Sequence, residues 1–167
     1  MEQYSLKALP VTSVLNKKAA VFMWATGPRL DYAIEVMKAW GLHYRGIAHI
    51  WVKTRKKDNG IINGQGVPPT YTKPTTELLL LGTTKKAGRM IPLQKFNTAQ
   101  VVLCPRAGHS EKPEIFRQLI EQTLKPPYTK LEMFARKKTP GWTVIGDGVG
   151  GEDIMTSLAK LNGTYIP

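Results

Sequence analysis

Strand-like and helix-like segments alternate along this chain of 167 residues, which favours an α/β layer fold. Residues 19–25 are continuously apolar and stop at Gly27 and Pro28, as expected for a central strand buried on both faces. Apolar residues then recur at helical spacing over residues 30–40, and Gly41 ends the helix. Similar patterns predict further strands over residues 46–53, 77–83, 100–104, 130–135 and 142–145, and further helices over residues 113–124 and 154–161. The length and the lack of an internal repeat predict a single domain, residues 1–167.

The chain carries a large positive charge, with 24 lysine and arginine residues against 12 aspartate and glutamate residues and a net charge of +12. A charge of this size favours a polyanionic partner, most often DNA or RNA, although it can also serve solubility alone. The basic residues gather in three predicted loops, which together could line one rim and hold phosphates: residues 53–57, 85–89 and 136–138.

The irregular stretch of residues 54–76 stands out among these loops, because long structureless loops in compact domains are usually functional or disordered. We expect its basic side chains to contact phosphates and its tyrosine to stack on a base. The residues predicted to bind nucleic acid are Arg55, Lys56, Lys57, Tyr71 and Lys73.

Few residues suit metal or thiol chemistry. Cys104 is the only cysteine, which excludes an intrachain disulfide and a cysteine-only zinc site. His43, His49 and His109 lack metal-ligand spacing, so no metal is expected. Ser110 follows His109 directly, and adjacent side chains point apart, so the two do not form a catalytic pair. No apolar run is long enough to span a membrane and the first ten residues lack a signal layout, so we expect a cytoplasmic protein without a membrane partner.

A glycine-rich segment, Gly146-Asp147-Gly148-Val149-Gly150-Gly151, satisfies the pattern G-x-G-x-x-G. It follows a predicted strand and opens a predicted helix, as a nucleotide-binding loop does, because glycines allow close approach and a helix N-terminus offers free amide donors. No second strand follows to complete a βαβ unit, and no acidic residue lies at the usual distance, so the dinucleotide fingerprint is incomplete. A simple glycine-rich turn and a loop for a nucleoside-bearing cofactor other than NAD both stay open.

Several sequence blocks occur together in a characteristic order. They are ALPV, AVFMWAT, AIEVMKAWGLHYRGIAHIWVKT, TYTKPTTELLLLGT, QVVLCPRAGHSEKPEIFRQLIEQ, KLEMFARKKTPGW and GDGVGGEDI. Each block alone is weak, but AWG before a W-x-K strand, ELLLLG, HS-x-KP, and LE-x-FAR before GW are jointly specific. From about residue 4 to residue 161, the chain resembles the N(6)-adenine methyltransferase family typified by the catalytic subunit of the messenger-RNA adenosine methyltransferase, which has many bacterial and phage members.

The resemblance implies a Rossmann-like, S-adenosylmethionine-dependent methyltransferase that transfers a methyl group directly to N(6) of adenine in DNA or RNA. The family's LE-x-F-x-R strand end and the turn after the next strand usually border the adenosine and ribose of the cofactor. Here these positions are Glu132, Phe134, Arg136, Gly146, Asp147 and Gly148. Asp147 stands where the family has asparagine, so it can accept a hydrogen bond from a ribose hydroxyl but cannot donate one. Gly148 replaces a glutamate or glutamine and offers no side-chain contact.

Family members also carry an Asp-Pro-Pro-Trp-like motif, whose acidic residue accepts a hydrogen bond from the adenine amine. The two Pro-Pro pairs of this chain do not substitute, because Val67 precedes one and Lys125 precedes the other. We therefore expect a methyltransferase domain without its first catalytic strand, and the catalytic residue stays unassigned. The alternative is a catalytically degenerate member that binds nucleic acid and supports an active partner in a homo- or hetero-dimer. A third possibility is a small basic nucleotide-binding domain.

Overall fold

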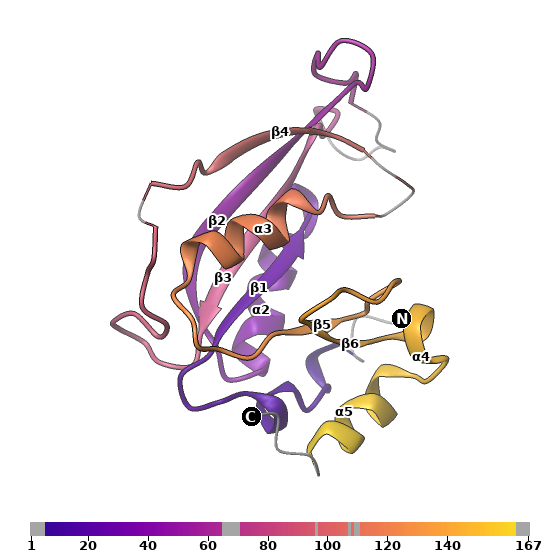
Figure 1. Cartoon of the computed structure of the whole chain (residues 1–167). Coiled ribbons are helices and arrows are strands. Elements are labelled where there is room, and N and C mark those ends of the chain that lie inside the picture. The colour runs from indigo at the N-terminus through magenta and orange to yellow at the C-terminus, as the bar shows by residue number, and fades with distance from the viewer. Residues whose placement is uncertain (1–5, 65–70, 96, 107, 109–110, 163–167) are drawn as a thin grey trace.

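The computed structural model describes residues 6–64, 71–95, 97–106, 108 and 111–162, and these residues form a mixed α/β structure with two sheets (Figure 1). The larger sheet has the strand order β1-β3-β2-β4 and consists of β1 (Ala20–Ala25), β2 (His43–Thr54), β3 (Thr76–Thr83) and β4 (Val101–Pro105). β3 runs antiparallel to β1 and to β2, whereas β4 is parallel to β2. The smaller sheet pairs β5 (Leu131–Met133) with β6 (Thr143–Ile145) in parallel.

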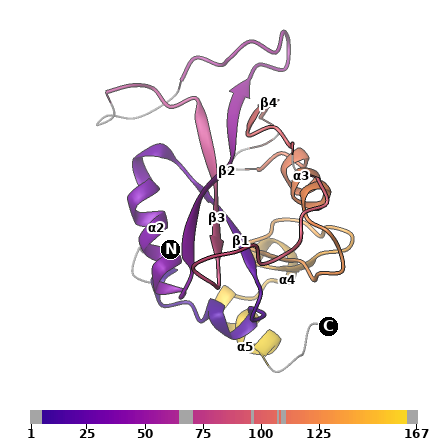
Figure 2. The same cartoon turned by 90° about the vertical axis from the view of Figure 1, so that its left-hand side faces the viewer.

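Helices cover both faces of the larger sheet. Helix α2 (Leu30–Ala39) lies on one face and α3 (Ile115–Thr123) on the other (Figure 2). Two 3-10 helices, η1 (Val11–Val14) and η2 (Gly27–Arg29), flank β1. After β6 come the short helix α4 (Asp147–Gly150) and then α5 (Ile154–Asn162).

The apolar core has two parts because successive residues of a strand point to opposite faces of the sheet. On β3, Leu80 packs into the cluster with Met37 of α2 and Leu158 of α5. Its neighbour Leu79 packs on the other face with Trp51 and Phe116. All six side chains are almost completely buried, so β3 is covered on both faces.

The strands and helices expected from the sequence occur close to their predicted bounds, but the expected position of β1 in the sheet is wrong. A continuously apolar run led us to expect a central strand, yet β1 is an edge strand that pairs with β3 alone. Five of its six residues are only partly buried. The physical reason is that an apolar run predicts burial and not neighbours, and the free side of β1 faces a large cavity.

Candidate functional site

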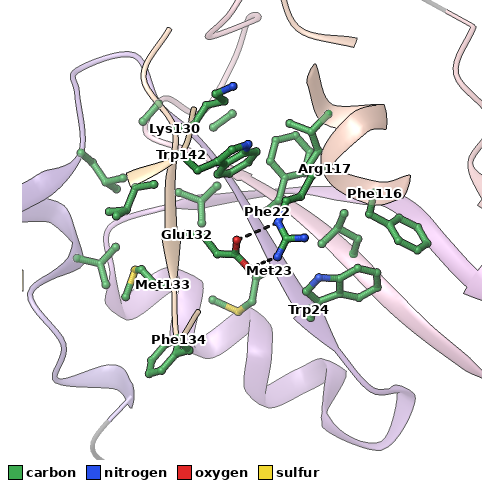
Figure 3. Close-up of a pocket in the computed structure, with 18 of the residues that line it drawn as sticks. Phe22, Met23, Trp24, Phe116, Arg117, Lys130, Glu132, Met133, Phe134 and Trp142 are labelled. Atoms are coloured by element: carbon green, nitrogen blue, oxygen red, sulfur yellow. Dashed lines mark hydrogen bonds and ion pairs between the residues drawn. The ribbon is translucent and has the colours of Figure 1, made fainter. Parts of the chain in front are cut away.

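A cavity of about 1560 Å³ is lined by both β1 and β5 (Figure 3). From β1 it receives Phe22 and Trp24, and from α3 it receives Phe116. Among the described residues, β1 pairs with β3 only and β5 pairs with β6 only, so both strands have an unpaired edge. Small-molecule pockets usually have volumes of about 300–1,000 Å³, so this cavity exceeds what one small ligand needs.

The end of β5 forms part of the cavity wall. Glu132, Phe134 and Arg136 all line the cavity, as three of the six predicted cofactor residues. Phe134 has a φ of 59° and is 44% exposed. A left-handed backbone at a bulky aromatic residue is uncommon, and such strain clusters at functional sites.

The other three predicted residues, Gly146, Asp147 and Gly148, form the turn at the start of α4, and none of them lines the cavity. This turn packs against the backbone of residues 134–136. A Cβ on Gly146 would lie 2.7 Å from the backbone nitrogen of Ala135. A Cβ on Gly148 would lie 2.6 Å from the Cα of Arg136. These two glycines are therefore required for close backbone packing, which accounts for the first half of the glycine-rich pattern without a bound phosphate.

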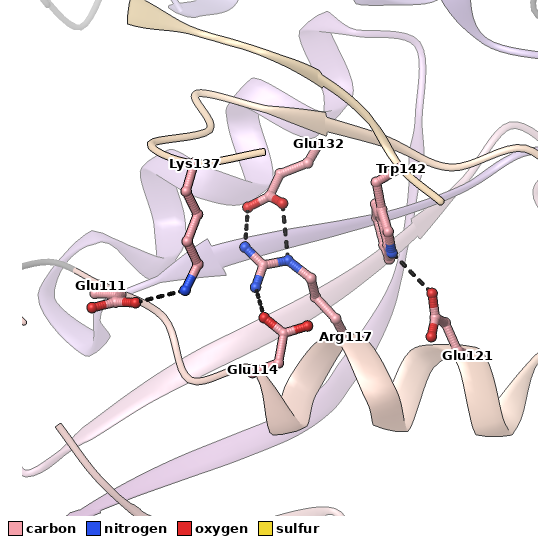
Figure 4. Close-up of polar contacts among 7 residues, drawn as sticks. All are labelled: Glu111, Glu114, Arg117, Glu121, Glu132, Lys137 and Trp142. Carbon is pink, nitrogen blue, oxygen red and sulfur yellow. Dashed lines mark hydrogen bonds and ion pairs between the residues drawn. The ribbon is translucent and has the colours of Figure 1, made fainter. Parts of the chain in front are cut away.

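Polar contacts tie α3 to the β5–β6 sheet (Figure 4). Arg117 of α3 donates two hydrogen bonds to Glu132 of β5. One turn later, Glu121 accepts hydrogen bonds from Lys130 Nζ at 2.6 Å and from Trp142 Nε1 at 2.9 Å. These contacts join the two sheets through α3, because Phe116 of the same helix is anchored in the core of the larger sheet.

A second charged cluster lies at the boundary of β2 and β3. The carboxylate of Glu77 is bound by Lys53 Nζ at 2.7 Å and by Lys112 Nζ at 2.5 Å. Each ammonium also lies over an indole ring, Lys53 over Trp51 at 5.2 Å and Lys112 over Trp24 at 5.5 Å from the ring centroid. Burial by itself raises the pKa of Glu77, but hydrogen bonds from Lys112 and Lys53 outweigh it and hold that pKa below its ordinary value. Glu77 is therefore ionised at neutral pH, with both oxygens engaged.

Sequence reasoning did not anticipate this cluster, although a signal was present. Its members come from three of the blocks that carry the family resemblance: Trp51 and Lys53 from W-x-K, Glu77 from ELLLLG, and Lys112 from HS-x-KP. Charged residues inside or beside apolar segments are costly unless paired, so the occurrence of Lys53, Glu77 and Lys112 in separate segments pointed to a shared contact.

The predicted nucleic-acid residues lie on one projection, which we name the basic arm and define as residues 54–64 and 71–75. It extends from the end of β2 and the start of β3, away from the β5–β6 sheet (Figure 1). Arg55 is used within the arm, because its guanidinium donates to both oxygens of Asp58 and to the carbonyl of Ile61.

The other four residues predicted to bind nucleic acid are better placed than Arg55 to reach a ligand. Lys56 and Lys57 are exposed and have no ion-pair partner among the described residues, and Lys73 and Tyr71 are exposed as well. The structure does not support a single basic rim, because residues 85–89 lie beyond the opposite end of β3. Of residues 136–138, Lys137 is paired with Glu111.

The other sequence features give weaker indications of function. No three metal-ligating side chains gather within the described part of the chain. No helix of that part is long and apolar enough to cross a membrane. Burial raises the pKa of the Cys104 thiol, which makes it a poor nucleophile. His109 and Ser110 lie outside the described residues.

Comparison with known proteins gives a consistent result. The MT-A70 family model matches residues 1–148. The type II methyltransferase M.MunI of Mycoplasma sp is 32% identical over 137 residues, which cover 82% of this chain and 53% of that protein. The N6-methyladenosine RNA methyltransferase MTA1 of Pyricularia oryzae is 31% identical over 150 residues, or 86% of this chain and 38% of the relative. The human N(6)-adenosine-methyltransferase catalytic subunit METTL3 is 26% identical over 147 residues, which cover 85% of this chain and 24% of that protein. The chain thus spans about half or less of the length of these relatives.

Proposed function

The chain belongs to the MT-A70 family, and from this premise we propose that it is the cofactor-binding part of an S-adenosylmethionine-dependent N(6)-adenine methyltransferase acting on DNA or RNA. The observation that carries the proposal is the cavity wall at the end of β5. There Glu132, the left-handed Phe134 and Arg136 come together on one large, mainly apolar cavity.

These three residues fit the chemistry of S-adenosylmethionine. The Glu132 carboxylate can accept hydrogen bonds from ribose hydroxyls, and the Phe134 ring offers an apolar face to adenine. Arg136 adds donors to the same wall. The turn of residues 146–148 packs against the backbone of this wall and limits its movement. When bound, the cofactor supplies a methyl group on a positively charged sulfur.

The acceptor for the adenine amine is the part that the described residues do not supply. The amine needs such an acceptor because its lone pair is delocalised into the ring. Glu77 is held by two lysines and Glu132 by Arg117. Glu111 is paired with Lys137, and Asp147 is not among the residues that line the cavity.

We therefore assign the acceptor to a strand from outside the described residues that enters the cavity between β1 and β5. Both strands present unpaired backbone groups there, which favours the addition of a strand. A strand in this position would join the two sheets into one Rossmann-like sheet and one domain. The volume of about 1560 Å³ leaves room for the strand together with the cofactor.

Replacing Arg136 tests the cofactor wall. Arg136→Ala should weaken S-adenosylmethionine binding by about 1 to 3 kcal/mol, roughly 5- to 150-fold in Kd, the range for loss of a hydrogen bond from a charged group. Isothermal titration calorimetry measures the change. Arg45→Ala is the matched control, since Arg45 is an exposed arginine that bonds the carbonyl of Lys86. Equal dissociation constants for the two folded variants would refute the assignment.

The basic arm is proposed to hold the phosphates of DNA or RNA. Replacing Lys56 and Lys57 together with alanine should weaken binding about equally for all sequences, because phosphate contacts carry no sequence information. On duplex DNA, the slope of log K against log salt should flatten by up to about 0.9 for each lost contact. The matched control is the double variant Lys85→Ala, Lys86→Ala, which removes the same amount of positive charge from a site beyond the other end of β3. If both double variants change the slope alike, the arm has no particular role.

A further inference from the structure

Arg117 makes a two-pronged contact with Glu132 at the cavity wall. Its Nε donates to Oε2 at 2.9 Å and its second terminal nitrogen donates to Oε1 at 2.6 Å. The first terminal nitrogen donates to Glu114 at 2.5 Å. The side chains of Arg117 and Glu132 are only 15% and 26% exposed. This planar, bidentate geometry orients the carboxylate as well as binding it.

Arg117 projects from a helix that is fixed against the larger sheet. Phe116, the residue before Arg117, is fixed in the aromatic cluster of the larger sheet, with its ring 4.8 Å from that of Trp24. Glu114 holds Arg117 from the preceding turn, at i,i+3 spacing. Arg117 therefore reaches across from a fixed helix, and both Arg117 and Glu132 line the cavity (Figure 3).

The contact leaves Glu132 with unused acceptor positions. An ionised carboxylate has about four lone-pair sites, and Arg117 occupies one on each oxygen. One site on each oxygen is left for another donor. Glu114, Arg117 and Glu132 together carry a net charge of −1, so the group still attracts hydroxyl donors. Two neighbouring hydroxyls, as on a ribose, match this pair of sites.

We propose that Arg117 is a positioning residue for the cofactor: it fixes the Glu132 carboxylate so that its remaining acceptor sites receive the ribose hydroxyls. This inference rests on the proposed function. Without Arg117, Glu132 would have to order its own side chain on binding, and it would stand unpaired in a largely buried wall, both of which cost free energy. The opposite possibility is that Arg117 competes with the cofactor for Glu132. Removing Arg117 would then tighten cofactor binding, whereas a positioning role predicts weaker binding.

The test compares S-adenosylhomocysteine with its 2′-deoxy analogue by calorimetry. The unaltered chain should prefer the ribose ligand by about tenfold, the factor for one hydrogen bond to a charged group. Arg117→Ala should weaken binding of the ribose ligand by about tenfold and lose the preference. Arg117→Lys keeps the positive charge but cannot donate two parallel hydrogen bonds, so it should recover part of the ribose preference. Glu132→Gln, nearly identical in shape, should also lose the preference and serves if Arg117→Ala does not fold.

Glu121→Gln is the control for a merely structural link, because it weakens the other tie between α3 and the smaller sheet and should keep the ribose preference. Tighter binding by Arg117→Ala would show competition and overturn the inference. An unchanged ribose preference in Arg117→Ala, with tight binding by the unaltered chain, would overturn the positioning role alone. Failure of the unaltered chain to bind S-adenosylhomocysteine would overturn the proposed function and this inference with it.

Discussion

Residues 1–167 alone should transfer methyl groups to adenine at least about a hundredfold more slowly than the same residues fused to an Asp-Pro-Pro-Trp strand. Loss of a single transition-state hydrogen bond of this kind costs about two to three orders of magnitude in rate, and loss of the base pocket adds to it. The acidic candidates within the chain do not compensate, since Glu77 and Glu132 are already bound by cationic side chains.

The assay follows labelled methyl groups from S-adenosylmethionine to adenine-containing oligonucleotides. Its matched control is a fusion with Ala-Pro-Pro-Trp, which should fill the same space between β1 and β5 yet stay slow. This control separates completion of the sheet from supply of the acceptor. Rapid turnover by residues 1–167 alone would mean that the acceptor lies within them, and Glu77→Gln would then be the first variant to measure.

Gly146→Ala should lower the free energy of unfolding by about 3 kcal/mol. The φ of 149° and ψ of 164° at Gly146 fall in a backbone region that essentially only glycine adopts, at a cost of about 1 to 3 kcal/mol for other residues. The added Cβ would also press on backbone atoms of residues 134 and 135 at 2.7 to 2.9 Å, and such overpacking costs about 1 to 3 kcal/mol.

Urea unfolding measures this loss, with Gly150→Ala as the control. Gly150 lies in α4, and a Cβ there meets no atom within 4 Å, so its replacement should be neutral or slightly stabilising. The two glycines are only four positions apart in the sequence. Equal effects at both would mean that the turn of residues 146–148 does not buttress the cavity wall as described.

Local patterns were enough to predict the helices and strands. The helix of residues 30–39 has apolar residues at helical spacing, and it ends before Gly41, whose φ of 68° suits glycine. Sheet order could not be predicted in the same way. The apolar run of β1 indicated that the strand is buried. It could not indicate that β3 lies beside one edge of the strand and a cavity beside the other, because that depends on contacts between distant segments.

The candidate site shows the same division. Glu132, Phe134 and Arg136 were found through family resemblance, because no periodicity marks them as a group. Two features depend on tertiary packing and were not predicted. The Lys53–Glu77–Lys112 cluster needs the pairing of β2 with β3 and the approach of the loop before α3. The contact of Arg117 with Glu132 needs α3 to lie across the cavity from β5.

The central claim is that the β5 end of the cavity binds the adenosyl cofactor. Its most direct test is to titrate S-adenosylhomocysteine into ¹⁵N-labelled protein and to follow backbone amide chemical shifts. The account predicts saturable shifts concentrated at residues 132–136 and in the supporting turn of residues 146–148, with the basic arm unaffected. No saturable shifts, or shifts confined to the basic arm, would contradict it.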